Sequence, residues 1–269
     1  MNIAMCYSGN LRSYEKTFDN QNKNVISNNN VNDIFVLTSD LNCERHYNPT
    51  RWKGEEHRIV GRRNPEHAAS GEYFFNEKRN KVIYNVENMD IHLRKIKELY
   101  CENLKQIEVK NEPAKENLWY FDDSMDWSLR RRCFQKTYEC HHMFLEYCIQ
   151  KQKQYDLVVR NRFDLTFSRP IDFLKLENVN LKNKVFCLGG WKNGLNFSVQ
   201  KGYFFDGFFA AEPETMTKVM SIYEQVNEYP NMALNLEVQM ENHLLKNDIE
   251  INFMFNSKNK SQRKYAIIR

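Results

Sequence analysis

Two short apolar segments near the start of the chain each stop abruptly at small polar residues. Residues 3–7 precede Ser8-Gly9-Asn10, and residues 33–37 precede Thr38-Ser39-Asp40. Apolar runs of this length that end in turn residues predict buried strands. Because α/β folds place ligands at the ends of such strands, Ser8, Gly9 and Ser39 are candidate ligand-binding residues.

Further along the chain, segments with strand character alternate with segments of helical periodicity. Strands are predicted at residues 82–86, 155–167, 185–188, 204–210 and 249–255, and helices at residues 91–104, 128–151, 213–223 and 234–245. The polar stretch at residues 41–71 is predicted to form a long loop or an irregular insertion. Strands interleaved with helices predict an α/β fold with a mixed, mostly parallel sheet flanked by helices.

Length, charge and cysteine content exclude several classes of protein. The chain has 269 residues, a size that one α/β domain can fill. Lys and Arg number 39 against 35 Asp and Glu, a net charge of +4 that suits a modest anionic ligand better than a nucleic acid. The seven cysteines are odd in number and include no Cys-x-x-Cys pair, which argues against a disulfide framework and a zinc ribbon and predicts a reducing compartment.

Targeting and membrane-spanning segments were sought in the sequence, because they would indicate the location of the protein in the cell. The N-terminus lacks the basic and apolar regions of a signal peptide, and no segment approaches the ~18 apolar residues of a membrane span. We therefore expect a cytoplasmic protein. Residues 258–269 form a basic C-terminal tail, which is expected to be a solvated end or else a contact for an anionic partner or a membrane surface.

Residues 155–167 carry the most informative pattern. On one continuous strand, Arg160, Arg162 and Asp164 share a face, opposite to apolar residues. Burying two cations and a carboxylate is costly unless they are paired or face a ligand. Two interpretations stay open at this point. The residues form an ion-pair ladder on a solvent-facing strand, or the arginines neutralise a diphosphate while Asp164 orients them, binds a divalent cation or holds a sugar hydroxyl.

The turn after the first predicted strand is a second candidate element. Gly9 would let backbone amides approach a phosphate or a base, and Arg12 would add a positive charge close by. The turn lacks Gly-x-Gly-x-x-Gly and the lysine of a Walker motif, which argues against dinucleotide binding and ATP hydrolysis.

Three segments, in the same order along the chain, resemble a family of glycosyltransferases from bacterial polysaccharide and lipopolysaccharide loci and from large DNA viruses. They are Ile-Ala-Met-Cys-Tyr-Ser-Gly-Asn-Leu-Arg-Ser-Tyr-Glu-Lys-Thr-Phe from residue 3, Asp-Ile-Phe-Val-Leu-Thr-Ser from residue 33 and Tyr-Asp-Leu-Val-Val-Arg-Asn-Arg-Phe-Asp-Leu from residue 155. The resemblance covers most of the chain. It implies one GT-A-like domain over residues 1–257, with a nucleotide-sugar-binding half at about 1–168 and an acceptor-side half at about 169–257.

The matching motifs also imply which residues bind the donor. They are Ser8, Gly9, Arg12, Arg160, Arg162 and Asp164. Many A-type enzymes hold a metal through Asp-x-Asp, whereas this chain reads Arg162-Phe163-Asp164 in the corresponding place. Mn²⁺ or Mg²⁺ held weakly by Asp164 and the donor phosphates is one option, and arginine in place of the metal is the other.

Candidate acids lie in the C-terminal half. Asp206 interrupts an aromatic run at residues 204–210, and apolar surroundings can raise the pKa of a carboxyl group toward the range of a general base. The resemblance places an acceptor-side acid about here, while an aspartate that bonds the backbone of a turn is the alternative. Glu237 and Glu241 are one turn apart on a predicted helix and face either the same cleft or solvent.

Together these features predict a hexosyl- or pentosyltransferase that moves a sugar from a nucleotide-diphosphate donor to a hydroxyl of a glycan or glycoprotein. Arg160 and Arg162, with Arg12 as a further candidate, would stabilise the leaving diphosphate, and Asp206 would be the base of an inverting reaction. Two other classes stay open. One is a sulfotransferase-like or other nucleotide-dependent group transferase, and the other is a non-catalytic nucleotide- or glycan-binding module.

Overall fold

The computed structural model describes residues 1–11, 13–45, 73–76, 81–112, 126–189, 204–225, 236–254 and 265–267. Within these ranges it describes only the backbone of residues 42–45, 73–76, 81–84, 126–133, 189, 204–206, 236–238 and 265–267. The strands are β1 (Ile3–Ser8), β2 (Asp33–Ser39), β3 (Leu41–Arg45), β4 (Tyr73–Asn76), β5 (Lys81–Asn85), β6 (Leu104–Lys110), β7 (Leu157–Asn161), β8 (Leu165–Phe167), β9 (Lys184–Gly189), β10 (Phe204–Ala211), β11 (Glu250–Phe253) and β12 (Tyr265–Ile267). The α-helices are α1 (Tyr14–Gln21), α2 (Met89–Tyr100), α3 (Asp126–Lys151), α4 (Pro213–Met220), α5 (Ile222–Gln225) and α6 (Leu236–Lys246). Shorter helical turns are η1 (Asn22–Ile26), η2 (Ser27–Asn29), η4 (Cys101–Asn103) and η7 (Leu174–Leu176).

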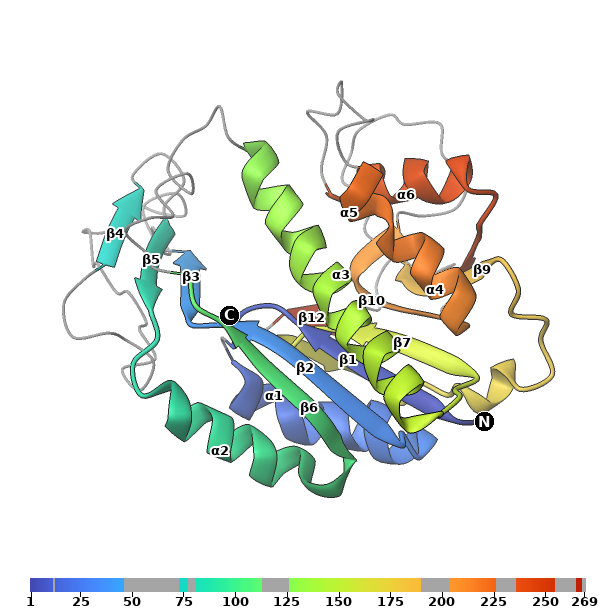
Figure 1. Cartoon of the computed structure of the whole chain (residues 1–269), viewed down its shortest axis with the longest axis horizontal. Helices are drawn as coiled ribbons and strands as arrows, with labels where there is room; N and C mark the ends of the chain where they lie inside the picture. The colour runs from blue at the N-terminus through green and yellow to red at the C-terminus, as the bar shows by residue number, and fades with distance from the viewer. Residues whose placement is uncertain are drawn as a thin grey trace.

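A seven-stranded sheet in the order β11-β9-β10-β7-β1-β2-β6 forms the centre of the protein (Figure 1). Strand β10 runs antiparallel to β7 and β9, and the other neighbouring pairs are parallel. Every residue of β1, β2 and β7 is buried, as expected for strands covered on both faces. The predicted α/β fold with a mixed, mostly parallel sheet flanked by helices is thus confirmed.

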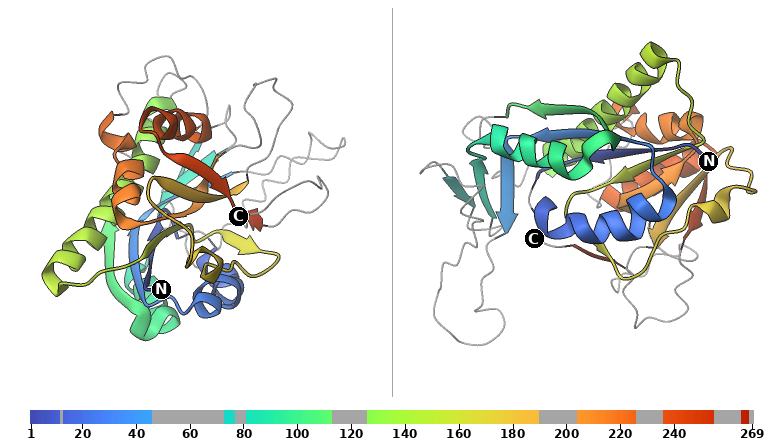
Figure 2. Two further views of the ribbon diagram at one scale, coloured as in Figure 1. Left: turned by 90° about the vertical axis from the view of Figure 1, so that its right-hand side faces the viewer. Right: turned by 90° about the horizontal axis from the view of Figure 1, so that it is seen from below.

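Helices cover both faces of this sheet (Figures 1 and 2). Helices α1 and α2 lie on one face, where Tyr7, Ile34 and Leu157 form part of one apolar cluster. Helices α3, α4, α5 and α6 lie on the other face, where Phe144 and Phe209 belong to a second cluster. Within the described ranges, no helix combines the length and the apolarity needed to span a membrane.

Two small sheets flank the central one, in the orders β3-β5-β4 and β12-β8. Strand β3 takes up the start of the predicted loop at residues 41–71, and residues 46–72 lie outside the described part of the chain. Strand β12 pairs antiparallel with β8, so part of the basic tail is fixed against the segment that follows β7 rather than being a free solvated end.

The predicted strand at residues 155–167 is instead two strands. Strand β7 pairs with β1 as far as Asn161, whereas β8 leaves the central sheet and pairs with β12. Residues 162–164 therefore form a turn between two sheets. The helix predicted at residues 91–104 ends earlier, because α2 stops at Tyr100 and Leu104 begins β6, a strand that was not predicted. Polar and apolar residues alternate over 106–110, which is the period of a strand.

A buried histidine couples the stability of the fold to pH. His141 of α3 is 1% exposed, and its Nε2 lies 2.9 Å from the hydroxyl of Thr217 in α4. Burial lowers the pKa of His141 from 6.5 to about 3. The unfolded chain therefore binds a proton below pH 6.5 that the folded protein does not bind until about pH 3, so stability is lost as the pH falls through this window.

We expect the free energy of unfolding to fall by up to about 1.4 kcal/mol per pH unit between about pH 6 and pH 4 through this one group. Urea denaturation at a series of pH values measures this slope. His141→Gln keeps a polar partner for Thr217 without the titration and should flatten the slope. The matched control is His142→Gln, because His142 is the exposed neighbour on the same helix. Equal slopes in the His141 variant and the wild type would contradict the assignment.

Candidate functional site

The order of the strands makes one position in the sheet a candidate ligand site. From β1 the chain moves outward through β2 to β6, and it then returns to place β7 on the opposite side of β1. The helices follow the same reversal, since α1 and α2 cover one face and α3 covers the other (Figure 1). Open α/β sheets bind ligands beside the carboxyl ends of the two strands where the order reverses. Here those ends are Ser8 of β1 and Asn161 of β7.

The first turn leaves β1 sharply at this position. The hydroxyl of Ser8 lies 3.2 Å from that of Thr137 in α3, and the amide of Gly9 donates to the carbonyl of Leu37 at 3.2 Å. Gly9 has a φ of +128°, a conformation that residues with a side chain rarely adopt. The glycine predicted from sequence is therefore required by the backbone. Arg12, predicted beside it, lies outside the described residues.

A lysine of α3 joins the ends of three strands. Lys136 is 7% exposed, and its Nζ donates to Ser39 Oγ at 2.7 Å and to Asn10 Oδ1 at 3.4 Å. The same ammonium group pairs with Glu112, which follows β6, at 2.7 Å. Ser39 is thus part of the edge, held by a lysine that the sequence analysis did not identify. The available signal was that Lys136 precedes Cys140 and Phe144 at four-residue intervals, on the stripe of α3 that faces the sheet.

Arg160 is a buried cation within the sheet edge. Its side chain extends from β7, and its Nη2 and Nη1 donate to the carbonyls of Ser8 in β1 and Gly207 in β10 at 3.3 and 3.2 Å. The residue is 7% exposed. Its guanidinium group therefore ties β7 to both neighbouring strands, β1 and β10, and places a positive charge next to the first turn.

Strand β10 is irregular where it meets Arg160. Its register with β9 shifts between Phe204 and Phe209, so the strand bulges within this segment, which includes Asp206 and Gly207. Such bulges bend a strand and redirect its side chains, often beside active sites. The backbone of Asp206 is thus next to the carbonyl that Arg160 binds, at the carboxyl edge of β7, whereas the side chain of Asp206 lies outside the described residues.

Arg162 and Asp164 lie in the turn after β7 and form a two-pronged ion pair. Arg162 Nε donates to Asp164 Oδ1 at 2.8 Å, and Arg162 Nη2 donates to Asp164 Oδ2 at 2.7 Å. The Asp164 side chain is 3% exposed and that of Arg162 is 24% exposed. The two predicted arginines thus differ in access: Arg160 is enclosed by the strands, and Arg162 is the one that a ligand can reach.

The surroundings of Asp164 do not fit a metal ligand. Both of its oxygens accept hydrogen bonds from a guanidinium group, which would repel a cation at the same carboxylate. Among the residues that the structure describes, no group of three or more His, Cys, Asp and Glu side chains could hold a metal ion. The arrangement favours arginine in place of Mn²⁺ or Mg²⁺.

A second carboxylate is buried on the helix that packs against β10. Glu241 of α6 is 7% exposed, and burial raises the pKa of its carboxyl group. It therefore differs from an ordinary solvated helix residue, whereas Glu237, one turn earlier, has a side chain outside the described residues.

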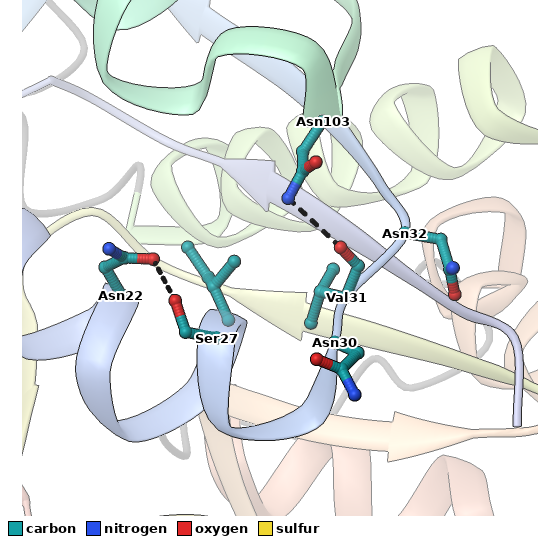
Figure 3. A pocket seen from close by; sticks show the side chains of 7 residues that line it. Asn22, Ser27, Asn30, Val31, Asn32 and Asn103 are labelled. Carbon is teal, nitrogen blue, oxygen red and sulfur yellow. Dashed lines mark hydrogen bonds between the residues drawn. The ribbon is translucent and has the colours of Figure 1, made fainter.

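A hollow of about 390 Å³ lies at the opposite edge of the sheet (Figure 3). It is lined by uncharged residues: Asn22, Ile26, Ser27, Asn30, Val31, Asn32 and Asn103. Asn32 precedes β2 and accepts a hydrogen bond from the amide of Ile3 at the start of β1. The hollow therefore lies at the amino ends of the strands, and its lining lacks the cations that a diphosphate requires.

Comparison with known proteins shows no family, and two solved structures align with most of the chain at low similarity. No family model and no curated protein matches the sequence. One solved structure that aligns with the chain is 4-diphosphocytidyl-2C-methyl-D-erythritol synthase from Anaerococcus prevotii DSM 20548, with a TM-score of 0.43 and 12% identity over 94% of this chain and 84% of that chain. Another is the galactosyltransferase LgtC in complex with donor and acceptor sugar analogs, with a TM-score of 0.42 and 11% identity over 94% of this chain and 73% of that chain.

Proposed function

We propose that this protein is a cytoplasmic glycosyltransferase that moves a sugar from a nucleotide-diphosphate donor to a hydroxyl of a glycan or glycoconjugate. The observation that carries the proposal is the cationic edge at the switch point between β1 and β7. There Arg160 binds the carbonyl of Ser8, just before the glycine turn, and Arg162, two residues further along the chain, is partly exposed. Diphosphates are bound by fork-shaped guanidinium groups and by backbone amides of tight turns.

The reaction follows from the charges. As the bond between the sugar and the diphosphate breaks, the leaving group takes the electron pair and develops negative charge, which Arg162 would stabilise. The acceptor hydroxyl forms the new bond to the sugar carbon and gives its proton to a carboxylate, for which Asp206 is the candidate. Arg160 would fix β1 and β10 relative to each other beside the reacting groups, because it binds a carbonyl of each strand.

Ligand-dependent thermal stability tests the proposal and its metal requirement. We expect a nucleoside diphosphate, screened among UDP, GDP, CDP, ADP and dTDP, to raise the melting temperature even in excess chelator, because arginines supply the positive charge. At a free ligand concentration of 100 times Kd the stabilisation is about 2.7 kcal/mol. A shift that appears only with Mn²⁺ would return the metal to the site, and no shift with any nucleoside diphosphate or nucleotide sugar would overturn the proposal.

Two additions to the same experiment separate the other functional classes. Adenosine 3′,5′-bisphosphate is the product nucleotide of a phosphosulfate donor, so stabilisation by it alone would favour the sulfotransferase-like alternative. Release of free nucleoside diphosphate from the stabilising nucleotide sugar, followed over time with a glycan acceptor, distinguishes an enzyme from a binding module. A binding module would be stabilised by the nucleotide sugar without releasing the diphosphate.

A further inference from the structure

Side chains, rather than neighbouring strands, hold the backbone of Arg162. Strand β7 ends at Asn161, so Arg162 lies beyond the hydrogen bonds of the central sheet. Its amide donates to the side-chain oxygen of Asn161 at 2.8 Å, and its carbonyl accepts from Gln21 Nε2 at 3.0 Å. The position of the partly exposed Arg162 therefore depends on these two buried side-chain amides.

Gln21, the last residue of α1, makes most of the contacts to this turn. Its Nε2 lies 3.0, 3.2 and 2.7 Å from the carbonyl oxygens of Arg162, Phe163 and Leu165. The hydroxyl of Thr17, one turn earlier on α1, also donates to the Phe163 carbonyl. Side chains of helix α1 thus bind the backbone carbonyls of the turn.

The other end of the Gln21 side chain is fixed as well. Its Oε1 accepts from the Tyr7 hydroxyl at 2.8 Å and from Asn161 Nδ2 at 3.2 Å, and Asn161 Nδ2 also lies 3.1 Å from the Tyr7 hydroxyl. Gln21 is 1% exposed and Asn161 is fully buried. Hydrogen bonds in a buried network of this kind specify one orientation for each member, because any other orientation leaves polar groups unpaired.

We infer that Gln21 is a positioning residue for Arg162, and that it holds the turn so that the guanidinium group meets the donor diphosphate. This inference rests on the proposed function. Asp164, the partner of Arg162, lies in the same turn, so a displaced turn moves the ion pair as a unit and leaves the pair itself intact. Gln21 therefore sets the position of the Arg162–Asp164 pair relative to Ser8, the last residue of the neighbouring strand β1, and to Gly9, which follows it.

The test compares Gln21→Met with a matched control, Asn29→Leu. Asn29 is 3% exposed and makes an equivalent set of backbone contacts, donating to the carbonyls of Val25 and Ile171 and accepting from the amide of Phe173, each at 2.7 Å. It ties η2 to residues 171–173, away from the turn. Both variants should lower the melting temperature. Only Gln21→Met should weaken the affinity for the nucleoside diphosphate that stabilises the wild type, by about tenfold or more.

A double-mutant cycle separates positioning from general loosening of the structure. If Gln21 acts through Arg162, then Gln21→Met should change the diphosphate affinity of an Arg162→Ala protein by less than about twofold. Should Gln21→Met fail to fold, Gln21→Glu serves instead, because it keeps the acceptor for Tyr7 and Asn161 and removes the donor to the turn.

The outcomes distinguish this inference from the proposed function. A wild type that binds no nucleoside diphosphate overturns both. If Arg162→Ala weakens binding but the folded Gln21 variant does not, the proposed function stands and the inference fails. Equal losses of affinity in the Gln21 and Asn29 variants, or additive effects of the Gln21 and Arg162 substitutions, would also overturn the inference.

Discussion

Replacing Arg162 by alanine is expected to weaken nucleoside diphosphate binding by about 1.5 to 3 kcal/mol, or roughly ten- to 150-fold. Arg162 has the reach for this role because a quarter of its side chain is exposed while its fork is aligned by Asp164. The fork matches two phosphate oxygens at once, so Arg162→Lys should rescue binding only in part. Isothermal titration of the wild type and both variants with the stabilising nucleoside diphosphate measures the difference.

The Arg162 substitution also affects stability, which requires a control. Arg162→Ala removes the two-pronged ion pair of Asp164, a carboxylate that is 3% exposed, and breaking such a buried pair is destabilising. The double variant Arg162→Ala/Asp164→Asn removes that charge and should recover much of the lost melting temperature. It should not recover diphosphate affinity. Unchanged affinity in a folded Arg162→Ala protein would remove Arg162 from the donor site.

The elements that sequence predicts best here are those whose pattern is both long and regular. Helix α3 was predicted at residues 128–151 and is observed at 126–151, because its apolar residues keep helical spacing over many turns. Strands β1 and β2 were predicted from short apolar runs with clear polar ends. Strand β6 was missed because a period of two over a few residues is easily taken for the end of the preceding helix.

At the candidate site, the alternation of residues along the sequence did not predict the path of the backbone. Alternation along residues 155–167 placed Arg160, Arg162 and Asp164 on one face of one strand, whereas the chain changes sheets after Asn161. That change depends on β12, which lies about a hundred residues later in the sequence, and on Gln21 far upstream. Sequence therefore singled out both arginines as candidates, but the division between an enclosed Arg160 and an accessible Arg162 depends on tertiary contacts.

Lys136 is a site residue that the sequence analysis did not identify. A lysine on the buried stripe of a helix can be recognised in the sequence. Its partners Asn10, Ser39 and Glu112, however, lie at or just after the ends of three different strands. Only the parallel pairing of β1, β2 and β6 brings these three strand ends together at the carboxyl edge of the sheet. A buried cation is tolerated there because each of its neighbours supplies an oxygen.

Asp206→Asn is expected to leave donor binding intact and to slow sugar transfer by ~10²-fold or more, the usual contribution of a positioned base. The backbone supports this position for a base. Asp206 lies in the bulge of β10, one residue before the carbonyl that Arg160 binds, so the strand is redirected at the same edge where the diphosphate is expected. Rates of transfer and diphosphate affinity, measured on the same preparation, separate the chemical step from binding.

Glu241 supplies the comparison that decides whether Asp206 has this role. Glu241 is 7% exposed and burial raises the pKa of its carboxyl group, but it lies on α6, whereas the backbone of Asp206 lies next to the carbonyl that Arg160 binds. We expect Glu241→Gln to transfer sugar at nearly the normal rate. If Asp206→Asn is nearly normal and Glu241→Gln is impaired with diphosphate affinity unchanged, the base belongs to α6, and the bulge in β10 then serves to hold Gly207 against Arg160.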